Sequence, residues 1–148
     1  MRGAVITIVA IAIIVILGIF YYSYQQNSGT PIANNGAGQI LPSRTHTVEI
    51  TSSGFSPSTL EIKKGDIVVF LNIDSRSHWS ASAMHPTHRV YPGSDINKCG
   101  TIQRNSIFDA CRAINTGENF TFQFNEVGSW NYHDHVNINF QGTIVVGE

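Results

Sequence analysis

Apolar and polar residues alternate with a period of two from Thr45 onward, which is the pattern of strands that bury one face. Gly, Ser and Pro separate the apolar stretches, as turns between short strands require. Strands are predicted at residues 48–50, 60–62, 67–71, 120–124, 130–132 and 143–146. A short helix is predicted at residues 106–113. This pattern predicts an all-β fold, either a Greek-key β-sandwich or a barrel.

The N-terminal segment has a different pattern. Residues 4–20 form an uncharged, almost wholly apolar run, and a group of tyrosines follows it. A helix of this length, with its aromatic rim, spans a hydrocarbon core of about 30 Å. Arg2 precedes the run and the next basic residue is Arg44, so the positive-inside rule puts the N-terminus in the cytoplasm. We therefore expect residues 1–24 to form one transmembrane helix that anchors an extracytoplasmic domain to the cell membrane.

A cleaved signal peptide is the alternative for this segment. Its apolar region would be about 7–15 residues long and would end in a small-x-small cleavage site. The run in this chain is longer, and the YYSYQQ segment that follows it is a poor cleavage site. Export of the rest of the chain follows from either interpretation.

Residues 25–43 separate the predicted anchor from the predicted strands. They are rich in Gly, Asn, Ser and Pro and show no hydrophobic period, which is typical of a flexible linker. Residues 44–148 then remain as a single domain. The 9 basic and 10 acidic residues of the chain give a net charge of −1, and the basic residues are scattered. A nucleic-acid partner is therefore not expected.

The chain has two cysteines, Cys99 and Cys111, in the middle of the predicted domain. In an exported protein, an even number of cysteines without CxxC spacing favours a disulfide. Thiolate ligation of a metal is the alternative. It is less favoured because neither cysteine is close in sequence to the histidine-rich segments.

The order of several motifs resembles the cupredoxin family, to which plastocyanin and amicyanin belong. The opening half contains GFSP (54–57), LEIKKGD (60–66) and VVFLN (68–72). The closing half contains GENFTF (117–122), GSWNYH (128–133) and GTIVV (142–146). The resemblance implies a cupredoxin-like sandwich, with the first copper-binding histidine of the family falling on His78.

The other copper ligands of that family are missing. Amicyanin-like members carry Cys-x-x-His-x-x-Met before the last strand, and this chain has Asp134, Asn137 and Phe140 at the corresponding positions. A blue type 1 centre needs a copper–thiolate bond. Type 1 copper is therefore not expected.

His133-Asp134-His135 occupies this region instead and resembles the His-x-His motif of multicopper oxidases, which supplies ligands to a type 2/type 3 copper cluster. Alternation along a strand puts His133 and His135 on one face, where two imidazoles can converge on one metal ion. Asp134 then points the other way, towards His78. Asp134 is either a further metal ligand or a turn or salt-bridge residue.

A second histidine segment follows His78 and contains His85 and His88. The resemblance implies that the fold brings both segments to one end of the sandwich. Imidazole suits copper and zinc without any thiolate, and an exported protein would meet copper as Cu(II). We predict copper as the cofactor, held by His78, His133 and His135 together with His85 or His88.

Three functions remain open from the sequence. The first is a membrane-anchored copper protein for electron transfer or copper handling, with a redox or copper-exchange protein as partner. The second is a copper-dependent oxidoreductase with a type 2-like centre, and the third is a metal-free binding module. A catalytic role is less favoured, because the chain has no second cupredoxin-like segment to complete a trinuclear cluster and no Gly-x-Ser-x-Gly nucleophile motif.

Overall fold

The computed structural model describes residues 42–148. The predicted anchor at residues 1–24 lies outside this part of the chain, as does the predicted linker except for its last positions. Within residues 42–148, no helix has the length and apolar character needed to cross a membrane.

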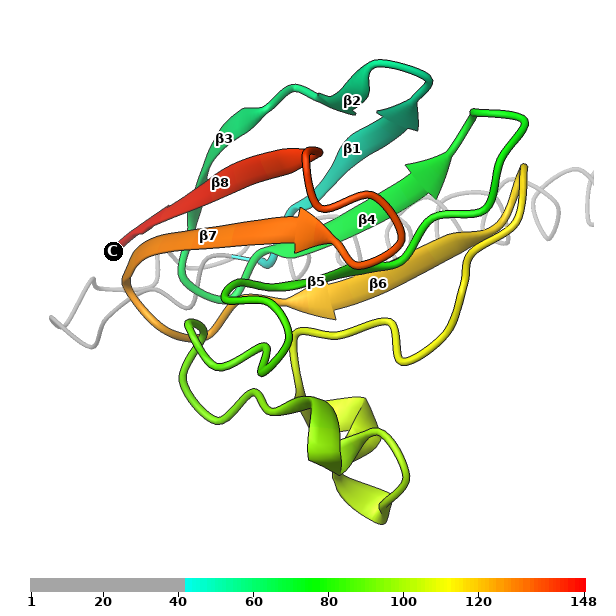
Figure 1. Ribbon diagram of the computed structural model, residues 1–148. Coiled ribbons are helices and arrows are strands. Elements are labelled where there is room, and N and C mark those ends of the chain that lie inside the picture. Colours follow the sequence, from blue (N-terminus) through cyan, green and yellow to red (C-terminus); the bar gives the residue numbers. More distant parts are fainter. Residues whose placement is uncertain (1–41) are drawn as a thin grey trace, which may run out of the picture. The chain divides into compact units, whose positions relative to one another are not determined.

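The described residues form two four-stranded sheets (Figure 1). The first has the order β2 (Gly54–Ser56), β1 (Thr45–Thr51), β4 (Ile67–Asn72) and β6 (Asn119–Gln123). The second has the order β3 (Thr59–Lys63), β8 (Gln141–Gly147), β7 (Gly128–Asp134) and β5 (Ser80–Ser82). The β1–β4 and β3–β8 pairs are parallel, and the other pairs are antiparallel. The all-β prediction is confirmed, and of its two alternatives the structure has the two-sheet sandwich.

The core contains the apolar residues that alternate along these strands. In β4, Val68 and Phe70 are fully buried while their neighbours in sequence are only partly so. The Phe70 ring lies 5.5 Å from that of Phe108 and 5.2 Å from that of Tyr132, measured between centroids. Because Tyr132 directly precedes the histidine motif, this aromatic packing fixes the strand that carries the site.

The connection from β5 to β6 corrects one prediction. The helix expected at residues 106–113 does not form. The connection has two 3₁₀ helices instead, η1 (Ile96–Lys98) and η2 (Ile102–Ser106), and the second ends where the predicted helix would begin. Residues 107–110 are all buried and run alongside β5, to which Phe108 and Ala110 are joined by backbone hydrogen bonds. A segment buried in this way satisfies its backbone groups by pairing with a strand, so a helix is not needed.

Cys99 and Cys111 form a disulfide with an S–S distance of 2.03 Å, which confirms the predicted pairing. It joins the end of η1 to the segment that lines β5. Since these are the two cysteines of the chain, the alternative of thiolate ligation does not apply.

Candidate metal centre

The His-x-His segment lies at the end of β7, which runs antiparallel to the short strand β5. His133 pairs with Ala81 of β5 and is buried, while His135 follows the end of the strand and is half-buried. Their ring centroids are 6.2 Å apart. The two rings thus lie on the same side of β7, as the alternation predicts.

The second histidine segment is a tight turn after β5. The backbone N–H of His88 donates to the carbonyl of Met84, which closes the turn beside β7. The ring of His85 lies 5.5 Å from that of His133 and 4.8 Å from that of His135. The ring of His88 lies 5.0 Å and 4.9 Å from the same two rings.

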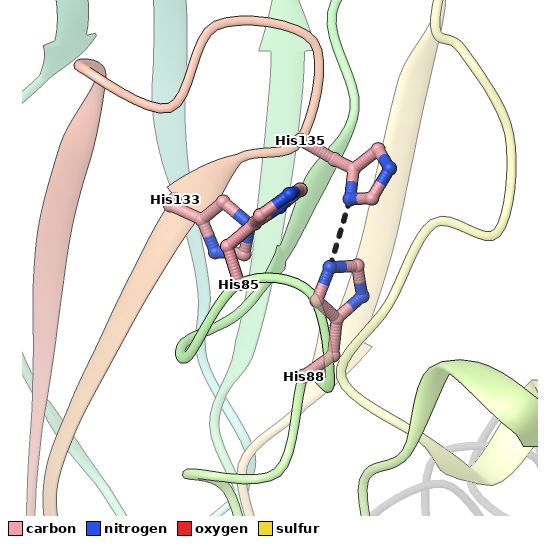
Figure 2. A group of neighbouring side chains, drawn as sticks. All are labelled: His85, His88, His133 and His135. Atoms are coloured by element: carbon pink, nitrogen blue, oxygen red, sulfur yellow. Dashed lines mark hydrogen bonds between the residues drawn. The ribbon is translucent and has the colours of Figure 1, made fainter.

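These four histidines converge on one volume, as Figure 2 shows. Each offers one ring nitrogen, and these nitrogens all lie within 4.8 Å of one another. Nitrogen ligands of a zinc or copper ion lie about 2.0–2.1 Å from it, so two on opposite sides are about 4 Å apart. Small side-chain rotations therefore bring all four imidazoles, His85, His88, His133 and His135, into coordination range. We call this group the four-histidine cluster.

His133 provides the test of whether these residues fit a metal ion. The residue is 4% exposed, and among residues 42–148 neither of its ring nitrogens has a hydrogen-bond partner. Burial, followed by the charges of His88, His85 and His135, lowers the pKa of His133 to about 4, so the ring is neutral at pH 7 with a free lone pair. A buried polar group without a partner is costly, and a cation bound at the free lone pair would remove the part of that cost that falls on this nitrogen.

Asp109 lies behind His88. Its Oδ2 is 2.5 Å from Nδ1 of His88, whose Nε2 is in turn 2.9 Å from Nδ1 of His135 (Figure 2). Burial alone would raise the pKa of the Asp109 carboxyl, but hydrogen bonds from His88, Trp79 and the Cys111 backbone outweigh it and lower the pKa. The carboxylate is therefore ionised beside the cluster.

His78, by contrast, lies outside the cluster. Its Nδ1 is 2.6 Å from Asp134 Oδ2 and its Nε2 is 3.0 Å from Asp74 Oδ2, so both ring nitrogens are already engaged. The other oxygen of Asp134 accepts from the backbone N–H groups of Trp79 and Val136. The structure therefore does not bring His78 or Asp134 to the other predicted ligands, and we leave both out of the proposed ligand set.

The sequence reasoning did not identify Asp109 or Asp74. Asp109 is near Cys111 in the sequence but meets His88 only because residues 107–110 run along β5. Asp74 follows the end of β4, and its contact with His78 spans four residues in a bend. The one available signal in the sequence was a carboxylate close to a histidine. Of these two residues only Asp74 carries that signal, because it lies four residues before His78.

Comparisons with known proteins identify the fold. No family model and no curated protein matches the chain. Among solved structures, a purple cupredoxin from Nitrosopumilus maritimus is 24% identical over 68% of this chain and 98% of its own, with a TM-score of 0.52. A reduced Cu(I) form of an amicyanin mutant at pH 4 is 17% identical over 82% of this chain and 95% of its own, with a TM-score of 0.51.

A third similar structure is the Cu-containing nitrite reductase NirK from Thermus scotoductus SA-01. It is 23% identical over 80% of this chain, with a TM-score of 0.54, and the match covers 25% of the reductase. Identities of this size establish the architecture and leave the chemistry to the residues of the site. The domain of residues 42–148 has the cupredoxin fold.

Proposed function

We propose that this protein binds one copper ion through the four-histidine cluster and handles copper at the extracytoplasmic face of the cell membrane. The observation that carries the proposal is the convergence of four imidazoles around His133, whose buried ring nitrogens have no partner within the described residues. The cupredoxin fold of similar copper proteins supports it. The membrane location rests on the apolar run at residues 4–20.

The chemistry of the donor set favours copper among divalent metals. Four neutral nitrogen donors suit Cu(II) and Zn(II), and the affinity of such a site is greater for Cu(II) than for Zn(II). Magnesium and calcium require oxygen ligands, which the cluster does not offer. An oxidising extracytoplasmic environment, consistent with the disulfide, would present copper as Cu(II).

Copper handling is favoured over electron transfer. Nitrogen-only sites prefer a tetragonal arrangement around Cu(II), so the ligands would have to rearrange on reduction. Such rearrangement slows electron transfer but does not hinder the uptake and release of the ion.

The surroundings of the cluster also suit exchange of the ion with a partner protein. His85 is exposed, and a cavity of about 300 Å³ borders it together with His133. Met84, on the rim of this cavity, is 65% exposed, and Ile138 on the same rim is 51% exposed. A partner could therefore reach the ion over His85 and contact an apolar rim. Its chemistry would be that of a copper-exchange protein.

The test is copper binding by the full-length chain, purified without metal in detergent. Competition titration with Cu(II) should give one ion per chain in the wild type. The double variant His133→Ala/His135→Ala should remain folded and lose tight binding, because it lacks two of the four donors. The matched control is His46→Gln, which changes a histidine that contacts Asp66 and lies outside the cluster.

Two results would contradict the proposal. One is wild-type copper affinity in the folded double variant, which would place the ion elsewhere. The other is the absence of stoichiometric copper binding in the wild type, which would favour the metal-free binding module.

A further inference from the structure

We propose that Asp109 is the positioning residue of the copper site: it orients His88 directly and His135 through Trp79. The ligand role of these histidines rests on the proposed function, whereas the orientation of His88 by Asp109 can be tested without metal.

Both oxygens of the Asp109 carboxylate are occupied. Oδ2 faces Nδ1 of His88 at 2.5 Å, while Oδ1 accepts from Nε1 of Trp79 at 2.6 Å and from the backbone N–H of Cys111 at 2.7 Å. The side chains of Asp109 and His88 are both 0% exposed. Because both oxygens of this buried carboxylate are hydrogen-bonded, the carboxylate has one orientation, and its hydrogen bonds fix the orientation of the His88 and Trp79 rings.

The contact with Asp109 determines which nitrogen of His88 can bind an ion. A carboxylate accepts hydrogen bonds, so Nδ1 of His88 carries the proton and Nε2 carries the lone pair. That Nε2 points to Nδ1 of His135, into the centre of the cluster (Figure 2). A histidine that donates its second N–H to a carboxylate is also a more basic ligand, which favours Cu(II) over Cu(I).

Trp79 carries the effect of Asp109 to the other side of the site. Its indole ring packs on the ring of His135 with centroids 4.6 Å apart, and its carbonyl accepts from the backbone N–H of His135 at 2.7 Å. The backbone N–H of Trp79 donates to Asp134 at 2.8 Å. Trp79 thus donates to a carboxylate both from its indole N–H and from its backbone N–H. A shift of the Asp109 carboxylate would therefore move the indole ring that packs on His135.

The position of Asp109 is itself set by the fold. Its backbone forms a bridge with Ala81 of β5, the residue that pairs with His133 of β7. The disulfide of Cys111 holds the chain two residues further on. Asp109 therefore links its own segment, residues 107–110, to both histidine segments: directly to His88, and through Ala81 to His133.

The experiment uses the full-length chain and compares the wild type with Asp109→Asn. Asparagine has one acceptor oxygen, so it cannot serve His88 and Trp79 together. Nitrogen NMR of the metal-free wild type should show His88 in the Nδ1–H form, and Asp109→Asn should shift or mix the tautomers. With copper, the variant should still bind one ion but lose about 10–100-fold in Cu(II) affinity, with a higher Cu(II)/Cu(I) potential and altered EPR parameters.

The matched control is Asp66→Asn. Asp66 is also a buried carboxylate that contacts a histidine and backbone N–H groups, but its partners are Arg44, His46 and Lys63, outside the cluster. Its Cu(II) affinity, potential and EPR spectrum should equal those of the wild type. A general loss of stability would occur in both variants. A change in copper affinity, potential and EPR spectrum that occurs in Asp109→Asn alone therefore cannot be attributed to lost stability.

The outcomes separate this inference from the proposed function. An Nε2–H form of His88 in the metal-free wild type would overturn the inference without any variant. So would a folded Asp109→Asn protein with wild-type affinity, potential and EPR spectrum. An Nδ1–H form that depends on Asp109, in a wild type that binds no copper, would support the orientation of His88 while refuting the proposed function.

Discussion

His78 stands where the cupredoxin resemblance places a copper ligand, yet it lies in a buried hydrogen-bond network. It is 2% exposed and lies between the carboxylates of Asp74 and Asp134, with the ring of Phe140 stacked at 5.8 Å. With a carboxylate beside each ring nitrogen, neither nitrogen is free to bind a metal ion. We therefore assign His78 a structural role, in which its ring holds the fully buried Asp134 carboxyl group in place.

Replacement of His78 by alanine should destabilise the protein and leave copper binding in place. The change leaves Oδ2 of the buried Asp134 without its hydrogen-bond partner, and a buried polar group left in this way costs about 1–3 kcal/mol. Denaturant unfolding measures this cost, and a copper titration of the folded variant should still give one ion per chain. A folded variant that binds no copper would return His78 to the ligand set.

The long strands are the elements that sequence pattern predicts best. β4 and β6 lie within one residue of their predicted bounds, and β1 and β7 contain their predicted strands but are longer, with seven residues each. β2 and β5 were missed because they are short and lack an apolar alternation; β5 is Ser-Ala-Ser, and all of it is buried. Pairing with neighbours, rather than propensity, makes β5 a strand.

One turn between elements predicts a pH dependence of stability. Asp66 directly precedes β4, after the turn from β3, and it accepts hydrogen bonds from the backbone N–H groups of Arg44 and Lys63. Burial alone would raise the pKa of this carboxyl, but these bonds and the contact with His46 lower it below its ordinary value of 3.8.

The sign of the effect follows from proton binding. As pH falls, the unfolded chain protonates at Asp66 before the folded protein does, so acid favours unfolding. The stabilisation is complete above the ordinary value of 3.8 and is lost as pH falls through the lowered pKa. Asp66→Asn should therefore show a smaller loss of unfolding free energy on acidification than the wild type. Parallel pH curves for the two proteins in denaturant titrations would refute this role.

At the scale of the whole molecule, the sequence predicted more of the fold than of the site. The order of the motifs and the alternation of apolar and polar residues were sufficient to predict a cupredoxin-like sandwich. The disulfide followed from the cysteine count and the expected export. The convergence of His85 and His88 on the β7 histidines depends on a turn after β5, a strand that local pattern does not reveal. Asp109 was missed for a similar reason, because its contacts with the site are made across the fold.

EPR spectroscopy of the Cu(II)-loaded full-length chain is the most direct test of the central claim, a copper site made of nitrogen donors alone. The four-histidine cluster predicts a nearly colourless 1:1 complex with a large parallel hyperfine splitting and couplings to several imidazole nitrogens. An intense blue or red charge-transfer band in the optical spectrum of the same sample would show a thiolate ligand. It would contradict both the four-histidine cluster as the copper site and the disulfide. A spectrum without nitrogen couplings would show that copper binds away from His85, His88, His133 and His135.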